Sequence, residues 1–256
     1  MCLVIRSPQE LQTWRRSQGP QSIGFVPTMG ALHEGHQSLL QISRQQNDLS
    51  ILSIFVNPTQ FNDKRDLEKY PVTWESDLKM AEKNNVDVLF APTFEMMYPD
   101  QYQYKISESD LSKELCGHDR PGHFDGVLTV VMRLFQLVQP DRAYFGEKDF
   151  QQLALIQGMA KAFFLNCEII PVPTVREADG LAMSSRNSRL SVTEREKAPR
   201  IYNILKNSRS SSEAQQQLEE QGWSVDYVHD RLIGSSKRRF VAVRVGEVRL
   251  IDNVEL

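Results

Sequence analysis

The stretch from residue 23 to residue 42 constrains the fold of this chain more than any other part of its sequence. Its apolar start at residues 23–26 predicts a short buried strand, and Pro27 should end that strand because proline has no N–H to donate. Gly30 and Gly35 permit the tight course of a turn, and leucine and isoleucine side chains then follow at helical spacing. A strand, a glycine-containing turn and a helix start, in this order, form a site where free N–H groups and the helix dipole receive a phosphate.

Two histidines stand where this helix begins. His33 and His36 are three residues apart, and we interpret them as contacts to a phosphate and its leaving group. Two histidines in one turn also occur in solvated loops and in metal pairs. A short motif needs its structural context before it carries a function, so this stretch alone leaves all three interpretations open.

The composition fits one large or two modest globular domains. The chain has 256 residues, of which 40% are hydrophobic and 25% are charged, and this length suffices for a sizeable core. The net charge of −3 argues against nucleic acid as the main partner. We interpret the small basic cluster at residues 237–239 as a solvated turn.

The cysteines and the first residues bear on the compartment. Cys2, Cys116 and Cys167 are widely spaced and odd in number, so they predict neither a disulfide framework nor a zinc site. Charged residues interrupt the apolar runs near the N-terminus, and no run is long enough to span a membrane. We therefore expect a cytoplasmic protein with reduced thiols, without a signal peptide and without membrane association.

Apolar runs alternate with helical patterns through the first two thirds of the chain. Strands are expected at residues 23–26, 49–56, 86–90, 143–145 and 168–170, and helices at residues 8–17, 73–84 and 127–138. Successive strand–helix–strand units imply right-handed crossovers, so the expected fold is α/β with a Rossmann-like parallel sheet. Residues 92–101 have the length and composition of a loop over the site.

The last third predicts a smaller α+β domain. Pro171 and Pro173 bracket a hinge-like segment, and we place the boundary there, between a domain of residues 1–173 and a domain of residues 174–256. The expected elements of the second domain are a helix opened by a capping box of Thr193 and Glu196, a helix at 210–221, and strands at 225–228, 240–245 and 248–251.

Polar segments follow several of the expected strands, where open α/β sheets bind their ligands. Gln60 can donate and accept hydrogen bonds at once, which suits a hydroxy acid. Lys148 and Asp149 would offer a cation to a phosphate and a carboxylate to a ribose hydroxyl. The two hydroxyls and the guanidinium at residues 184–186 suit a polyphosphate. Each segment also has a plainer interpretation as an ordinary turn, helix start or loop, and His123 is interpreted as a structural histidine.

Four sequence blocks resemble one protein family, in order. They are Pro-Thr-Met-Gly-Ala-Leu-His-Glu-Gly-His at 27–36, Ser-Ile-Phe-Val-Asn-Pro-Thr-Gln-Phe at 53–61, the segments 120–126 and 146–152 taken together, and residues 179–187. The first block resembles the His-x-Gly-His signature of a nucleotidyltransferase superfamily. Together the blocks are similar to those of the pantothenate synthetases (pantoate–β-alanine ligases), and the resemblance covers nearly the whole chain.

The resemblance implies a ligase that joins pantoate to β-alanine at the expense of ATP, through a pantoyl-adenylate, with release of AMP and pyrophosphate. It also implies Mg²⁺ bound with ATP, and a homodimer formed through the larger domain. The implied catalytic residues are His33, His36, Lys148 and Arg186. The implied ATP-binding residues are Met29, Gly30, Ala31, Leu32, His33, Glu34, Gly35, His36, Gly146, Glu147, Lys148, Asp149, Val175, Met183, Ser184, Ser185 and Arg186. The implied pantoate-binding residues are Gln60 and Gln152, with Gln60 also near β-alanine.

Two features depart from the family pattern. The C-terminal part is shorter than the resemblance leads us to expect, which bears on how it would close over the site. The acidic stretch usual after Tyr70 and Pro71 is Trp-Glu-Ser-Asp at residues 74–77, so no protein ligand of the metal is assigned.

Two other functions compete with this one. Another nucleotidyltransferase of the superfamily, acting on a different small acid or phosphate, would share the histidines but need not have Gln60 and Gln152. A non-catalytic nucleotide sensor on the same fold should have lost His36, Lys148 or Arg186, and all three are present. Since a fold alone does not fix a function, the site decides between them.

Overall fold

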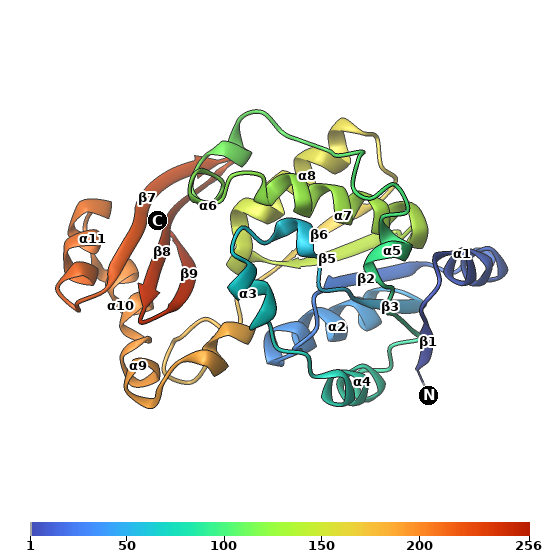
Figure 1. Cartoon of the computed structure of the whole chain (residues 1–256), viewed down its shortest axis with the longest axis horizontal. Coiled ribbons are helices and arrows are strands. Elements are labelled where there is room, and N and C mark those ends of the chain that lie inside the picture. The colour runs from blue at the N-terminus through green and yellow to red at the C-terminus, as the bar shows by residue number, and fades with distance from the viewer. Residues whose placement is uncertain (1) are drawn as a thin grey trace.

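The structure, a computed structural model, describes residues 2–256. Its larger part is a six-stranded parallel sheet with the strand order β1-β4-β3-β2-β5-β6 (Figure 1). The strands are β1 (Leu3–Ile5), β2 (Ile23–Thr28), β3 (Leu49–Ile54), β4 (Val88–Phe90), β5 (Arg142–Gly146) and β6 (Glu168–Val172). The predicted α/β class with a parallel sheet is confirmed.

Helices cover both faces of this sheet. On one face lie α1 (Pro8–Ser17), α7 (His123–Val138) and α8 (Phe150–Ala162), whose apolar side chains join those of the strands in the largest core cluster. On the other face lie α2 (Glu34–Gln46) and α4 (Trp74–Lys83), which bury Leu40 and Ala81 completely. The short elements of this part are α3 (Lys64–Glu68), α5 (Phe94–Met97), α6 (Cys116–Asp119) and the 3-10 turns η1 (Pro58–Gln60), η2 (Leu111–Lys113) and η3 (Glu147–Asp149).

The chain changes its direction across the sheet at β2. From β2 it proceeds to β3 and β4 on one side, and it later adds β5 on the other side of β2. Ligands of open α/β sheets bind outside the carboxyl ends of the strands at such a switch point. The turn after β2 carries His33 and the turn after β5 carries Lys148, so the fold brings these two segments to one place.

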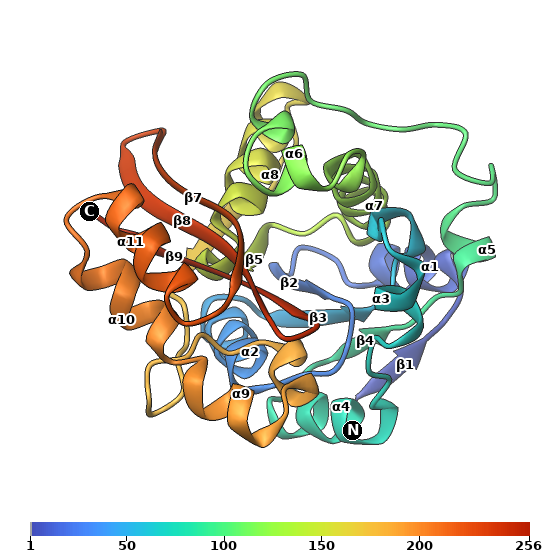
Figure 2. The same cartoon turned by 60° about the vertical axis from the view of Figure 1, so that its left-hand side comes forward.

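The chain after β6 forms a smaller α+β unit (Figure 2). Its antiparallel sheet consists of β7 (Ser224–Ile233), β8 (Ser236–Val245) and β9 (Val248–Glu255), and its helices are η4 (Ser185–Arg189), α9 (Val192–Lys197), α10 (Arg200–Asn207) and α11 (Ser211–Glu219). The unit has an apolar cluster of its own between the helices and the sheet. Tyr227, Phe240 and Ala242 belong instead to the core of the larger part, so the two parts pack directly against each other.

The prediction that Pro27 ends the first strand is wrong. β2 continues to Thr28 and pairs with β3 along its whole length, whereas its pairing with β5 stops at Phe25. The N–H of Phe55 in the β3 segment bonds to the carbonyl of Thr28, so by strand alternation the nitrogen of Pro27 faces β5. A missing N–H on that side costs the sheet no ladder bond.

The helix α9 of the smaller unit begins two residues before the predicted position. Its capping box is Ser191 with Glu194, because the Ser191 hydroxyl accepts from the Glu194 N–H and the Glu194 carboxylate accepts from the Ser191 N–H. Thr193 and Glu196 have the same spacing, and the prediction chose the wrong one of two equivalent patterns.

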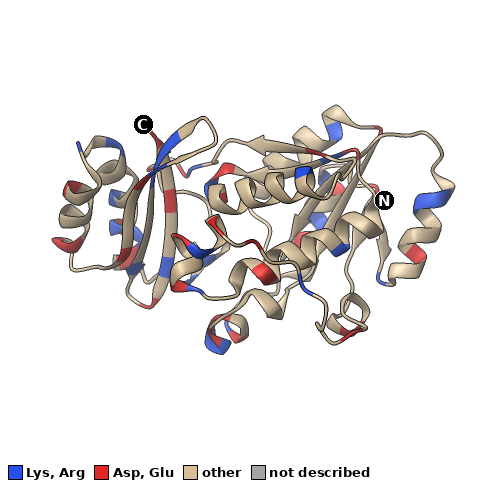
Figure 3. Ribbon diagram, turned by 90° about the horizontal axis from the view of Figure 1, so that it is seen from above, with Lys and Arg blue, Asp and Glu red and all other residues tan. Residues whose placement is uncertain are grey.

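The basic cluster at residues 237–239 lies within β8 and is no solvated turn. Arg239 is only 2% exposed. Its guanidinium pairs with Asp230 at 2.7 Å and donates to the carbonyl of Ser208 at 2.6 Å. Burial of a guanidinium is tolerable because these acceptors replace its hydration. Elsewhere, acidic and basic residues are interspersed over both parts of the chain (Figure 3).

Residues 92–101 do not form a loop over the site. They contain α5, and the Tyr98 side chain is 1% exposed in the core, where its hydroxyl donates to Asn57 Oδ1 at 2.9 Å. The aromatic side chains of this segment bind it to the core face of the sheet, so the prediction, which rested on length and composition, was wrong.

Candidate active site

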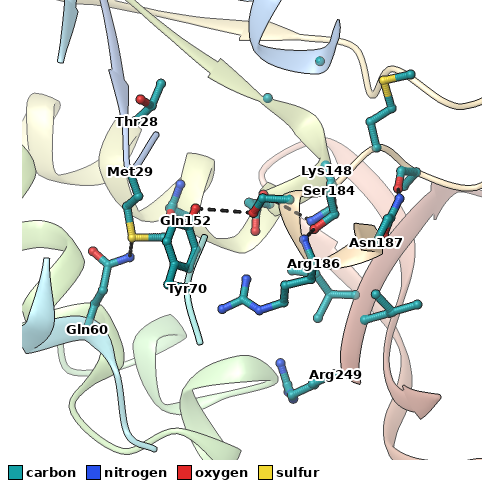
Figure 4. A pocket seen from close by; sticks show the side chains of 18 of the residues that line it. Thr28, Met29, Gln60, Tyr70, Lys148, Gln152, Ser184, Arg186, Asn187 and Arg249 are labelled. Atoms are coloured by element: carbon teal, nitrogen blue, oxygen red, sulfur yellow. Dashed lines mark hydrogen bonds and ion pairs between the residues drawn. The ribbon is translucent and has the colours of Figure 1, made fainter. Parts of the chain in front are cut away.

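A cavity of about 840 Å³ opens at the carboxyl ends of β2, β3 and β5. Figure 4 shows Met29 and Gln60 on one side of it and Ser184 and Arg186 on the other. The predicted site residues that line the cavity are Met29, His33, Gly35, His36, Gln60, Gly146, Lys148, Asp149, Gln152, Val175, Met183, Ser184, Ser185 and Arg186. The fold thus gathers segments that are far apart in the sequence around one space.

Five of the predicted residues are not among those that line the cavity. They are Gly30, Ala31, Leu32, Glu34 and Glu147. The first four belong to the turn that carries the two histidines, and the carboxylate of Glu147 pairs instead with Arg238 at 3.2 Å. Their part in ATP binding stays a prediction.

The side chains of His33 and His36 stabilise the turn after β2 by accepting hydrogen bonds from backbone N–H groups of the same segment. His33 caps α2, and its Nδ1 accepts from the Gly35 N–H at 3.1 Å, while His36 Nδ1 accepts from the His33 N–H at 3.3 Å. A Cβ at position 35 would lie 2.9 Å from His33 Cε1, so a larger residue there would have to shift the capping side chain. Because both Nδ1 atoms accept, both neutral imidazoles carry their proton on Nε2.

Both histidines are neutral at pH 7. Burial, aided by the Lys148 ammonium, lowers the pKa of His33 from 6.5 to about 4. Burial, aided by His33 and Lys148, lowers the pKa of His36 to about 3. The pair can therefore offer two Nε2–H donors to an anionic ligand without itself being charged.

These lowered pKa values predict that the protein loses stability as the pH falls below 6.5. His123 adds to the effect, since burial and the Arg120 guanidinium lower its pKa to about 3. In the unfolded chain each of the three histidines gains a proton near pH 6.5. In the folded chain the same side chains stay neutral until the pH approaches their lowered pKa values. Between pH 6 and pH 4.5 the free energy of unfolding should fall by about 1.4 kcal/mol per pH unit for each histidine.

Denaturant unfolding at a series of pH values measures this slope. His123→Gln should flatten it by about one third, whereas His118→Gln, at a side chain 81% exposed, should leave it unchanged. A free energy of unfolding that is constant from pH 7 to pH 5 would contradict the assignment of buried neutral histidines.

The turn with Lys148 follows β5 as predicted and is held by the C-terminal strand. Asn253 Nδ2 donates to the carbonyls of Glu147 and Lys148 at 2.9 and 3.0 Å, and its Oδ1 accepts from Arg238 at 2.9 Å. The Lys148 ammonium lies 3.7 Å from Asp149, and its side chain is 18% exposed. β9 thus fixes the backbone from which Lys148 reaches the cavity.

The segment with Ser184 and Arg186 is anchored to the larger part by one carboxylate. Asp66 in α3 pairs with Arg186 at 2.8 Å and with Arg189 at 2.6 Å. Ser185 donates to the hydroxyl of Tyr70 at 3.3 Å. Asp66 occupies only Nη2 of Arg186, so the guanidinium keeps other N–H groups for a phosphate.

Gln60 lies between Met29 and the start of α7. Its Nε2 approaches Met29 Sδ at 3.2 Å, and its Oε1 accepts from Asn57 Nδ2 at 3.1 Å. His123 Nδ1 donates to the backbone carbonyl of Gln60 at 2.8 Å, and His123 is 8% exposed. This contact agrees with the interpretation of His123 as a structural histidine. Gln152 lines the same cavity from α8.

Asp77 is the most consequential residue that the sequence did not single out. This side chain, 2% exposed, accepts from the Ala31 N–H at 2.9 Å and the Leu32 N–H at 2.8 Å, and also from the Thr73 hydroxyl at 3.0 Å. Ala31 has a φ of 50°, so the carboxylate holds a backbone course that an alanine adopts at some cost. Asp77 therefore anchors the histidine turn from α4.

Two further properties concern metals and membranes. Within residues 2–256, no group of three or more His, Cys, Asp or Glu side chains is placed to hold a metal ion. In the same described part of the chain, the helices lack the combination of length and apolar character that a membrane crossing needs.

Comparison with known proteins identifies the family. The family model described as pantoate-beta-alanine ligase matches residues 3–255. A pantothenate synthetase of Bdellovibrio bacteriovorus is 61% identical over 256 residues, which is 100% of both chains. One of Coxiella burnetii is 49% identical over 99% of this chain and 97% of its own. The C-terminal part that is shorter than expected is therefore shared with the Bdellovibrio protein.

Solved structures agree with these sequence matches. The crystal structure of a pantoate-beta-alanine ligase from Francisella tularensis, complexed with beta-gamma ATP and beta-alanine, has a TM-score of 0.94 and 41% identity, over 100% of this chain and 98% of that one. A pantothenate synthetase from Thermus thermophilus has a TM-score of 0.93 and 39% identity, over 99% of both chains. From the family model, the relatives and the shared fold together, the chain belongs to the pantoate–β-alanine ligase family.

Proposed function

We propose that this chain condenses pantoate with β-alanine to pantothenate, with ATP converted to AMP and pyrophosphate through a pantoyl-adenylate. One observation carries the proposal: His33 and His36 after β2 and Lys148 after β5 line the same cavity as Gln60 and Gln152. Family membership supports the overall reaction, and the Francisella relative was crystallised with beta-gamma ATP and beta-alanine.

The first step would be attack of the pantoate carboxylate on the α-phosphorus of ATP. A new P–O bond forms, and the bond from the α-phosphorus to the pyrophosphate oxygen breaks and leaves its electron pair on pyrophosphate. Two anions meet in this step, so catalysis consists of alignment and charge neutralisation. His33, His36, Lys148 and Arg186 would provide it, the histidines as neutral donors and Arg186 through the N–H groups that Asp66 does not occupy.

The second step needs no protein nucleophile. The neutral amine of β-alanine attacks the acyl carbon of the adenylate, an amide bond forms, AMP leaves with the electron pair of the acyl C–O bond, and the amine loses a proton. Gln60 and Gln152 would hold pantoate for both steps, with Gln60 also near β-alanine. The remaining residues of the nucleotide site would be those expected from the sequence, from Met29 to His36, from Gly146 to Asp149, Val175, and from Met183 to Arg186.

We propose that Mg²⁺ enters with ATP. Magnesium keeps several waters and is commonly bound through substrate phosphates, which fits a cavity whose described residues offer no carboxylate cluster. Held there, the ion would neutralise charge on the phosphates, while the protein residues position the two reacting groups.

The chain is proposed to act as two domains, residues 1–173 and 174–256, of which the second closes over the site. The separate sheets support this division, and the contacts of Asp66 with Arg186 and Arg189 across the boundary support the closure. The proposal also includes a homodimer through the larger domain and a cytoplasmic location. It further includes small-molecule substrates, without nucleic acid or membrane as partners. The three unpaired thiols fit a reducing compartment, and mass measurement in solution tests the dimer.

The products of the reaction test the proposed function. With ATP, Mg²⁺, pantoate and β-alanine, the purified protein should release AMP and pyrophosphate in amounts equal to the pantothenate formed. Without β-alanine, pyrophosphate should appear only once per active site, because the adenylate stays bound. Release of ADP and phosphate would refute the adenylate mechanism, and AMP formation without any need for pantoate would favour another nucleotidyltransferase.

A further inference from the structure

Arg120 is a cation of the cavity wall that has no carboxylate within ion-pair distance in the described part of the chain. Its Nη2 donates to the backbone carbonyl of Gln60 at 3.0 Å, and its Nη1 lies 3.2 Å from His123 Nε2. Since His123 Nδ1 donates its proton to the same carbonyl, Nε2 is the acceptor of this contact. Both partners of Arg120 are therefore neutral.

The other cations that line the cavity are all paired. Their partners among the described residues are Asp63 for Arg65, Glu247 for Lys69, Asp149 for Lys148, Asp66 for Arg186 and Arg189, and Asp226 for Arg244 and Arg249. Among residues 2–256, Arg120 is the one lysine or arginine of this wall without a carboxylate within ion-pair distance. A partly buried charge of this kind is costly until an anion arrives.

The surroundings of Arg120 place that anion near the residues proposed to bind pantoate. A smaller cavity of about 40 Å³ adjoins the main one and is lined by Arg120 together with Lys148 and Gln152. Burial, and then the neighbouring guanidiniums of Arg186 and Arg249, lower the pKa of Arg120 to about 10. Arg120 thus lies among the residues proposed for pantoate, and its position favours a negatively charged ligand.

We propose that Arg120 binds the carboxylate of β-alanine. This inference rests on the proposed function and adds a binding residue for the second acid. The pantoate carboxylate has to remain a free nucleophile, and a guanidinium that held it firmly would oppose its attack. The β-alanine carboxylate is unchanged from substrate to product, so a fixed cation can hold it through the whole second step. A guanidinium with one side on neutral acceptors presents its remaining N–H groups to one such carboxylate.

The consequence is a division of labour between the cations. Lys148 and Arg186 serve the phosphates in the first step, and Arg120 orients β-alanine so that its amine, at the other end of the molecule, faces the adenylate. Removal of Arg120 should therefore affect the second half-reaction and spare the first.

Kinetics of the two half-reactions test this on the full-length enzyme. Arg120→Gln keeps a donor for the Gln60 carbonyl and removes the charge. It should raise the KM for β-alanine by about 10- to 100-fold, the range for loss of a charge-assisted hydrogen bond. Pantoate-dependent release of pyrophosphate without β-alanine should stay within about threefold of wild type. Arg120→Lys should recover part of the loss, because it restores the charge but not the fork of donors.

A matched variant and a substrate without the carboxylate complete the experiment. Arg65→Gln removes a guanidinium from the rim of the same cavity, at a side chain 82% exposed, and should leave the KM for β-alanine unchanged. Propylamine, which has a methyl group in place of the carboxylate, should be a poor acceptor for wild type, and Arg120→Gln should discriminate less between the two amines.

Three results would overturn the inference. They are an unchanged KM for β-alanine in Arg120→Gln, a loss of the first half-reaction as large as that of the second, and wild-type use of propylamine as good as that of β-alanine. The propylamine result needs no variant, so it can overturn the inference even if Arg120→Gln fails to fold, and Arg120→Lys then tests the residue itself through the KM for β-alanine. A wild-type enzyme that makes no pantothenate would refute the proposed function instead, and the two failures are thus distinct.

Discussion

His36→Ala and Lys148→Ala should each slow formation of the adenylate by at least about a hundredfold, the scale for loss of one preorganised electrostatic contact. His36 offers an Nε2–H whose direction is fixed by the bond from the His33 N–H to Nδ1. Lys148 offers an ammonium on a turn that Asn253 holds in place. Single-turnover release of pyrophosphate from ATP and pantoate measures the step directly.

The loss should be confined to chemistry and nucleotide binding. Among the described residues, Lys148 forms an ion pair only with its neighbour Asp149, so its removal leaves no distant partner there without a contact, and the variant should stay folded. Lys69→Ala, at a rim lysine 57% exposed, is the matched control and should retain nearly full activity. Adenylation at the wild-type rate in either His36→Ala or Lys148→Ala would remove that residue from the mechanism.

Asp77→Asn should weaken both the fold and the site, although this side chain does not line the cavity. An asparagine has one acceptor oxygen, so it can satisfy only one of the two N–H groups at Ala31 and Leu32 and turns a donor towards the other. We expect the free energy of unfolding to fall by about 1–3 kcal/mol. The KM for ATP should rise as well, because the turn with the two histidines loses its anchor.

Denaturant unfolding and initial rates against ATP concentration measure the two effects. Glu75→Gln neutralises an exposed carboxylate two residues away in the same helix and should change neither. If Asp77→Asn had wild-type stability and an unaltered KM for ATP, the histidine turn would not depend on Asp77.

The parts of the site that the sequence predicted are those with local causes. The apolar run before Pro27, the glycines of the turn, and the helix start beside the two histidines all act within a few residues, so the pattern of the chain contains them. The same holds for the turn after β5. Chain order and crossover handedness then bring the two turns together in a parallel sheet, and the resemblance to one family supplied the ligands.

The parts that the sequence missed depend on partners far along the chain. Asp77 accepts from residues 45 and 46 positions away, Asn253 donates to carbonyls 105 and 106 positions away, and Asp66 pairs with Arg186 across 120 positions. Nothing in the local pattern distinguishes these side chains from solvated ones. The buried Arg239 was misjudged for the same reason, since Asp230 faces it only once β7 and β8 have paired.

The change in the direction of the chain across the sheet at β2 has a consequence for folding. A chain that has folded only as far as β4 contains the histidine turn but no Lys148 beside it, since β5 has yet to dock against β2. The serine and arginine of η4 arrive later still. A chain in which the sheet is only partly formed therefore has no complete binding site for the triphosphate. A ligand that binds only the finished state draws the folding equilibrium towards it, so cellular ATP would select and protect fully assembled molecules and leave partly folded ones unaided.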